Sequence, residues 1–116
     1  MTTRTEDQTT CANEVRLVGR VSGAPQEKEL PSGDRMWTFR VVVARASPRG
    51  RQTVDALECV AWSARTRRSV ATWQDGDVVE LTGELRRRFY RAGAATASRV
   101  EVEATQTRVI RRAASA

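Results

Sequence analysis

The densest group of side chains suited to chemistry is a run of arginines that contains two aromatic residues. The sequence RRRFYR occupies positions 86–91. An arginine guanidinium is a planar fork that pairs with phosphate oxygens, and an aromatic ring is a flat surface on which an unpaired base can stack. This combination of residue types is typical of a surface that binds nucleic acid.

Alternation along a strand decides which of these side chains can act together. If this segment is extended, Arg86, Arg88 and Tyr90 share one face, because successive side chains of a strand point to opposite sides. Phe89 has the parity of the apolar positions before it and is therefore predicted to face a barrel interior, although it stays a candidate contact for nucleic acid. Arg91 opens the turn that follows and is a further candidate.

A second flat side chain, Trp62, lies at the end of another alternating segment. Its neighbours Leu57, Cys59 and Ala61 have the opposite parity, so Trp62 is predicted to point outward and to stack on a base. The alternative is that Trp62 packs against a helix or against a second subunit. Arg40 on a strand and Arg49 and Arg51 in a loop are candidate walls of a groove that binds the nucleic acid. Arg20 is a further candidate on the grounds of its sequence motif alone.

The distribution of charge supports this interpretation. The 116 residues include 20 basic and 14 acidic side chains, a net charge of +6, and every basic residue except Lys28 is arginine. A GC-rich genome would also favour arginine, but it would not cluster the charge. From Leu85 onward the chain has eight arginines and two glutamates, so the last 32 positions hold the whole excess of positive charge. A localised basic surface of this kind attracts polyanions.

The composition excludes several classes of enzyme and cofactor site. The chain has no histidine and only two cysteines, Cys11 and Cys59, which excludes histidine-based catalysis, a disulfide scaffold and most zinc sites. It has no glycine-rich phosphate loop and no nucleophile elbow, and Asp75 and Asp77 flank Gly76 in an ordinary turn. We therefore predict a binding protein without catalytic residues, cofactor or metal.

Period-two alternation predicts the elements that position these residues. Strands are expected at about 13–22, 35–46, 53–62, 77–90 and 97–109. After the third strand, Ser63 can cap a short helix that has Val70 and Trp73 on its apolar side and Gly76 as its stop. Trp37 shares the parity of apolar neighbours and is assigned to the core. Three strands, a helix and two strands is the order of the all-β, five-stranded OB barrel.

The length and the composition of the two ends define the organisation of the chain. A single folded domain is expected at 13–110, with a disordered leader at 1–12 and a basic flexible tail at 111–116. The longest aliphatic run, 41–44, is far shorter than the roughly 20 residues that a membrane helix needs. The polar first residues do not read as a signal peptide. We expect a cytoplasmic, nucleoid-associated protein with no membrane partner.

Five blocks of the sequence, in this order, resemble the bacterial single-stranded DNA-binding protein (SSB) family. They are NEVRLVGRV at 13–21, LPSG at 30–33, LECVAW at 57–62, GDVVELTGEL at 76–85 and VEVE at 100–103. The resemblance covers about residues 13–110. It implies an OB-fold, usually a homotetramer, that wraps single-stranded DNA without sequence preference and without catalysis, in replication, recombination or repair.

The resemblance also suggests which residues contact DNA and where the chain departs from the family. The family's stacking aromatics map onto Trp62 and onto Tyr90 or Phe89. The family commonly has a Trp or Phe near the loop after the second strand. Positions 46–53 of this chain contain no aromatic residue, and their candidate DNA contacts are Arg49 and Arg51. The family's acidic tail has no counterpart, because residues 104–116 contain no Asp or Glu. Tail-mediated recruitment of repair proteins is therefore not expected.

Other functions and assembly states remain open at this point. One alternative is a tail-less SSB relative that works in primosome assembly, conjugation or transformation, with RNA as a second ligand. Another is an OB-fold adaptor whose basic strand docks an acidic protein. The expected partners are single-stranded DNA and further copies of the chain, in a dimer or a tetramer.

Overall fold

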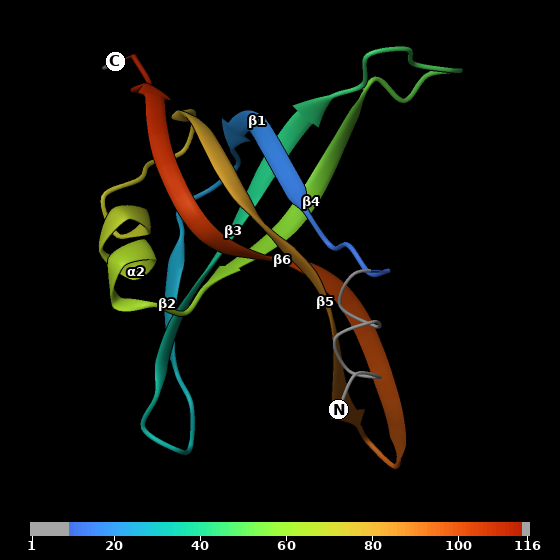
Figure 1. Cartoon of the computed structure of the whole chain (residues 1–116), viewed down its shortest axis with the longest axis vertical. Helices are drawn as coiled ribbons and strands as arrows, with labels where there is room; N and C mark the ends of the chain where they lie inside the picture. Colours follow the sequence, from blue (N-terminus) through green and yellow to red (C-terminus); the bar gives the residue numbers. More distant parts are fainter. Residues whose placement is uncertain (1–9, 115–116) are drawn as a thin grey trace.

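The computed structural model describes residues 10–114, which form six strands and one helix (Figure 1). In chain order they are β1 (Val15–Val21), β2 (Gln26–Glu29), β3 (Arg35–Ala44), β4 (Val54–Ala61), α2 (Ala64–Val70), β5 (Val78–Ala92) and β6 (Ala95–Arg111). Most of the predicted leader at 1–12 therefore lies outside the described residues.

Five of the strands close into a barrel. The sheet order is β1-β5-β6-β4-β3-β2, and an additional pairing of β1 with β3 closes the sheet on itself. The pairs are antiparallel except β4–β6, which is parallel. α2 packs against β3, β4 and β6. The predicted OB-fold, with five barrel strands and a short helix between the third and the fourth, is confirmed.

β2 is an element that the alternation did not predict. Its four residues are polar and exposed, so no apolar period marks them. The strand forms because its backbone pairs with β3 from Gln26↔Thr38 to Glu29↔Arg35. A tight turn joins the two strands, in which the Gly33 N–H donates to the Leu30 carbonyl over 2.8 Å. Here backbone pairing to a stronger neighbouring strand, not side-chain pattern, decides the structure.

The core lies inside the barrel and beneath α2. Val41 and Leu81 are among its fully buried side chains. Phe39 meets Trp73 edge to face, with ring centroids 5.2 Å apart. Trp37 packs against the same cluster and is partly buried, in agreement with its predicted core role.

The two cysteines lie in different environments. Cys59 is buried in the core and Cys11 is exposed, and both are free thiols. Burial raises the pKa of the Cys59 thiol to about 12, because the charged thiolate is disfavoured away from water. Cys59 therefore stays protonated and acts as a small apolar side chain, as predicted.

The helix begins as predicted but ends earlier. The Ser63 side chain accepts a hydrogen bond from the Thr66 N–H over 3.2 Å and so caps the N-terminus. The last helical residue is Val70, and Trp73 lies in the loop that follows rather than on the helix. Gly76, with φ +93°, lies in the turn just before β5. None of the helices in the described part of the chain is long and apolar enough to cross a membrane.

Two glycines allow the strands of the barrel to approach closely. A Cβ at Gly19 would overlap the Val42 carbonyl oxygen, and a Cβ at Gly83 would overlap the Glu103 carbonyl oxygen. The register of β5 against β6 also shifts between Thr82 and Gly83. A shift of this kind bends a strand. Gly83 thus lies where β5 bends around the barrel and tolerates no side chain.

The sequence predicted a basic flexible tail at 111–116, of which residues 115–116 lie outside the described residues. The described part, from Arg111 to Ala113, is fixed to the barrel. Arg111 belongs to β6. The buried Asp77 carboxylate accepts hydrogen bonds from Arg112 Nη1 (2.9 Å), from the Ala113 N–H (2.8 Å) and from the Gln74 N–H (2.9 Å). Arg112 also donates to the Thr72 carbonyl over 2.9 Å. The difference arises because a buried carboxylate requires donors, and this segment supplies two of them.

Replacing Arg112 with alanine is expected to lower the free energy of unfolding by about 1–2 kcal/mol at neutral pH. Burial opposes the charge on Asp77, but the hydrogen bonds prevail and hold the pKa of its carboxyl below the ordinary value. The stabilisation is therefore present above that ordinary pKa and is lost as the pH falls through the folded value. Urea titrations of wild type and R112A at several pH values measure the difference, which should shrink in acid. Arg111→Ala is the matched control, expected within about 0.5 kcal/mol of wild type.

Candidate nucleic-acid interface

The β5–β6 hairpin projects beyond the barrel and carries the predicted arginine–aromatic stripe (Figure 1). We call residues 85–102 the β5–β6 arm. Opposite residues of an antiparallel pair share a face, and the register pairs Arg86 with Glu101, Arg88 with Arg99 and Tyr90 with Ala97. The three predicted side chains on β5 therefore lie on one face of the arm.

Trp62 lies on the same face as this stripe. It follows β4, whose Val60 is aligned with Glu103 of β6, so the outer surface of β4 continues onto the arm. The Arg88 guanidinium carbon lies 4.8 Å from the centroid of the Trp62 ring, and that of Arg99 lies 5.8 Å from the centroid of Tyr90. We call this surface the stacking face: Trp62, Arg86, Arg88, Tyr90 and Arg99.

Phe89 does not face the barrel interior, contrary to the parity prediction. It is 69% exposed, and Leu85, of the same parity, is 48% exposed. The predicted alternation is nevertheless correct, because Leu85 and Phe89 lie on the same face of the arm, opposite the stacking face. The arm extends past the barrel there, and in the described part of the chain no core covers its inner side. Phe89 is thus separated from Tyr90 by the thickness of the sheet.

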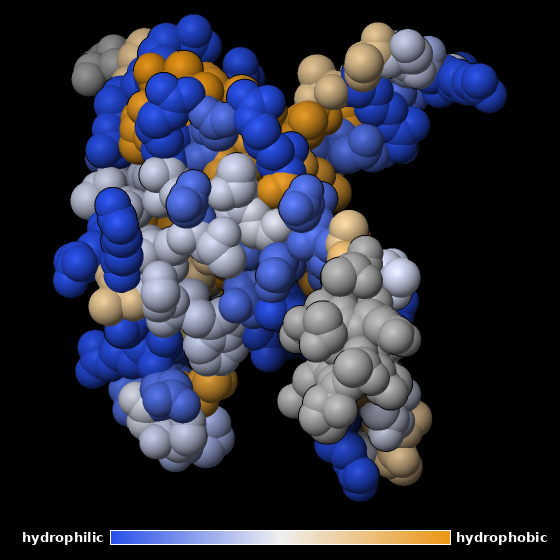
Figure 2. Space-filling model, viewed as in Figure 1, coloured by the Kyte–Doolittle hydropathy of each residue, from blue (hydrophilic) through white to orange (hydrophobic). Residues whose placement is uncertain are grey.

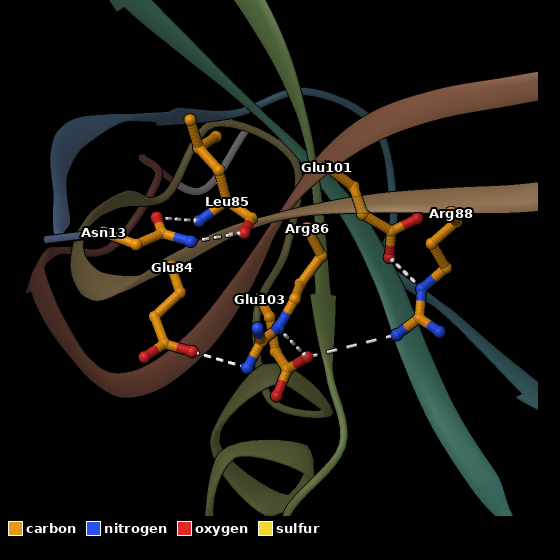
Figure 3. A network of polar contacts seen from close by, with 7 residues as sticks. All are labelled: Asn13, Glu84, Leu85, Arg86, Arg88, Glu101 and Glu103. Carbon is orange, nitrogen blue, oxygen red and sulfur yellow. Dashed lines mark hydrogen bonds and ion pairs between the residues drawn. The ribbon is translucent and has the colours of Figure 1, made fainter. Parts of the chain in front are cut away.

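Arg86 and Arg88 are held in a network of ion pairs (Figure 3). Arg86 Nη2 lies 2.6 Å from Glu84 Oε1, and its Nε lies 3.3 Å from Glu103 Oε1. Arg88 Nε donates to Glu101 Oε2 over 3.0 Å. The pairs of Arg86 join partly exposed groups, and such pairs are worth little in water. A phosphate can therefore replace the carboxylates of Glu84 and Glu103 at small cost.

Asn13 fixes the base of the arm. Its side-chain amide donates to the Leu85 carbonyl over 2.8 Å, and its side-chain oxygen accepts from the Leu85 N–H over 2.8 Å (Figure 3). The amide thus imitates one more residue of β1 pairing with β5. This contact sets where the arm departs from the barrel.

The other predicted arginines are spread around the molecule. Arg40 lies on the outer face of β3, with its Nε 2.6 Å from Glu58 Oε2. Arg49 and Arg51 lie in the loop between β3 and β4, and hydrophilic side chains cover the tip of this hairpin in Figure 2. Figure 1 shows that this hairpin and the β5–β6 arm point in different directions.

Several of these arginines carry charge that no carboxylate offsets. Arg91 lies near the tip of the β5–β6 arm, and Arg20 lies on β1 opposite Val42. Within residues 10–114, no ion pair is formed by the following exposed arginines: Arg20, Arg49, Arg51 and Arg91. They supply positive potential around the stacking face without forming one compact patch with it.

Three polar residues of the network were missed by sequence reasoning. Arg99, Glu101 and Glu103 alternate with the apolar Val100 and Val102 on the last strand. That alternation was visible and could have placed the three on the outer face of the strand. The alternation does not, however, reveal which residues of β6 lie opposite Arg86 and Arg88 of β5. The acidic partners of Arg86 and Arg88 therefore went unnoticed.

The sequence matches proteins that bind single-stranded DNA. Residues 12–110 match the model of the Single-strand binding protein family. A single-stranded DNA-binding protein of Bacillus cereus is 30% identical over 80 residues, which are 67% of this chain and 47% of that protein. Single-stranded DNA-binding protein 1 of Lactococcus lactis is 28% identical over 67% of this chain and 53% of its own length. The chain thus spans about half the length of these curated relatives.

A solved structure shows the same fold. The structure titled Plasmodium falciparum SSB complex with ssDNA superposes with a TM-score of 0.68 at 20% sequence identity. The match covers 88% of this chain and 96% of that one. Together with the family match over nearly the whole folded part, these findings show that the chain belongs to the single-strand binding protein family.

Proposed function

We propose that this protein binds single-stranded DNA without sequence preference and without catalysis, through the stacking face. One observation carries the proposal: Trp62 and Tyr90 lie on a single outward face, each with a guanidinium over its ring. Aromatic rings accept any base, because every base has a π-face, and arginines accept any phosphate. The names of the curated relatives and the family match point in the same direction.

The charges fit a strand that runs along the arm and over the barrel. Arg86 and Arg88 are already paired with carboxylates, so the long-range attraction for DNA comes from the exposed arginines that form no ion pair among the described residues. Unpaired bases would then stack beside or between the guanidinium planes, which also stack on bases. We infer a role in protecting or organising single strands during replication, recombination or repair, in the cytoplasm at the nucleoid.

The affinity for oligo(dT) is expected to fall linearly as log salt rises. Each phosphate contact of a single strand contributes a slope of about 0.7, so three or more arginine contacts give a slope of about 2 or steeper. A fluorescence titration with dT oligomers of several lengths, repeated between low and moderate ionic strength, measures this slope. An affinity indifferent to salt would exclude binding through these arginines.

Competitors in the same titration separate the alternatives. A sequence-tolerant single-strand binder should prefer oligo(dT) to duplex DNA of equal charge, because paired bases cannot stack on Trp62 or Tyr90. Competition by RNA of equal length would favour the relative with RNA as a second ligand. Binding to acidic protein surfaces with no affinity for oligo(dT) would favour the adaptor function.

We further propose that the protein forms a homo-oligomer. The face of the β5–β6 arm opposite the stacking face exposes apolar side chains: Leu85, Phe89 and Val100 at 48%, 69% and 47%. Clustered apolar exposure of this kind marks association surfaces in soluble proteins. In addition, β1 pairs with β3 at Arg20 and Val21, so that among the described residues the backbone edge at the start of β1 has no partner strand on that side. Sedimentation equilibrium distinguishes a monomer from a dimer or tetramer.

A further inference from the structure

One buried carboxylate lies behind both arginine–aromatic contacts of the stacking face. Glu101 is on β6, and its side chain is 1% exposed. Its Oε2 accepts the hydrogen bond of 3.0 Å from Arg88 Nε, and its Oε1 lies 3.4 Å from Arg99 Nε. The arginine over Trp62 and the arginine over Tyr90 thus meet at a single acidic group (Figure 3 shows Glu101 and Arg88).

This arrangement is a poor one for stability alone. Among the described residues, Glu101 Oε1 has no hydrogen-bond donor in acceptable geometry, so the 3.4 Å contact with Arg99 is an ion pair only. A buried carboxylate with an unsatisfied oxygen costs free energy that an apolar residue would not. Val60 of β4 is aligned with Glu103 on the same outer face and is buried, so this face also accommodates an apolar side chain. The cost of burying Glu101 therefore points to a role in holding Arg88 and Arg99.

We propose that Glu101 is a positioning residue that orients Arg88 and Arg99 for single-stranded DNA. This proposal rests on the proposed function and extends it to a residue that cannot itself reach solvent. Both arginines turn their Nε toward Glu101. A guanidinium has two further nitrogens, and its outer edge can still form a bidentate contact with phosphate. Glu101 thus fixes the inner edge of each fork and leaves the outer edge for DNA.

The opposite role for Glu101 is that of a competitor of the phosphate. A carboxylate near a DNA-binding surface repels the strand, so its removal should strengthen binding. Positioning predicts the reverse. If each released arginine occupies its binding orientation about one third of the time, the apparent affinity falls about threefold for each, and about tenfold for both. The sign of the change therefore decides between the two roles.

The experiment compares E101Q with E58Q in titrations with oligo(dT). Both variants remove one negative charge from the outer surface of the barrel, and within residues 10–114 Glu58 forms an ion pair only with the exposed Arg40. We expect E58Q to bind slightly tighter than wild type and E101Q to bind about tenfold weaker. The salt slope of E101Q should also fall, by up to about 1.4 if both arginine contacts are lost. A merely structural role would leave the slope of the folded protein unchanged.

Two surface variants test the proposal even if E101Q does not fold. Arg88→Lys and Arg99→Lys keep the charge but remove the planar fork that reaches Glu101 and phosphate together. Positioning predicts weaker binding for each, and bulk charge predicts no change. In the Arg88→Ala background, E101Q should lose part of its effect, because the two residues act together.

The outcomes also separate this proposal from the proposed function. Wild type that fails to bind oligo(dT) would end both. Wild type that binds, together with E101Q of equal or higher affinity, would overturn the positioning role of Glu101 and leave single-stranded DNA binding intact.

Discussion

Replacing Gly83 with alanine is expected to lower the free energy of unfolding by about 3 kcal/mol or more. The new Cβ would overlap the carbonyl oxygen of Glu103 and crowd the backbone of Ala104. Both obstacles are backbone atoms, which cannot rotate away as a flexible side chain can. The cost therefore includes a shift of β5 from β6 at the bend that starts the β5–β6 arm. Urea denaturation followed by far-ultraviolet circular dichroism measures it.

The control for this variant is Gly33→Ala in the turn between β2 and β3. A Cβ there would meet no atom within 4 Å, but Gly33 has φ +92°. Only backbone strain is added, which costs about 1–2 kcal/mol for a residue other than glycine. If G83A were as stable as G33A, the close approach of β5 and β6 would not be a constraint on this fold.

Replacing Trp62 with alanine is expected to weaken oligo(dT) binding by about 1–3 kcal/mol, roughly 5- to 150-fold. The variant removes a flat surface for a base and also the ring beneath the Arg88 guanidinium. Its effect on folding should be smaller, because Trp62 is only partly buried and its Nε1 has no hydrogen-bond partner among the described residues. Binding isotherms at fixed salt, with a denaturation curve for each protein, measure the two effects.

Trp37→Ala is the matched control for the tryptophan variant. Trp37 is also partly buried but packs against the core, away from the stacking face. It should lose stability, about 2 kcal/mol for a partly buried large side chain, with no change in the affinity of the folded protein. If W37A lost affinity and W62A did not, the stacking face would be assigned to the wrong side of the barrel.

Much of the fold follows from alternation, and the exceptions have physical causes. The strands around Leu17, Val41, Cys59 and Leu81 show apolar alternation in the sequence, because one face of each is buried in the barrel. β2 has no buried face, so its polar residues give no period. The prediction for Phe89 was wrong for a related reason. Parity assigns a side chain to a face, but only the length of the neighbouring strands decides whether a core covers that face.

The candidate site was predictable in its residue types and not in its pairing. Trp62, Arg86, Arg88 and Tyr90 were placed outward by parity, and the structure brings them to one face. The partners of those arginines depend on the register of β5 against β6 and of β4 against β6. The parallel β4–β6 pairing joins segments that are far apart in the chain, and no local sequence pattern predicts it. The fixing of Arg112 by Asp77 went unpredicted for the same reason.

The way the barrel is closed bears on how fast it can form. The hairpins β3–β4 and β5–β6 are local and need little loop closure, whereas β1–β3 and β4–β6 join distant segments through two and three aligned residue pairs. For each distant pairing, the entropy cost of closing the intervening loop is incurred before its few hydrogen bonds can form. Barrels dominated by such non-local pairs fold on a scale of about milliseconds to seconds. We therefore expect closure of the barrel, in which β1 meets β5 and β4 meets β6, to limit the folding rate. Until closure, Cys59 and its apolar neighbours are exposed to water and to other chains.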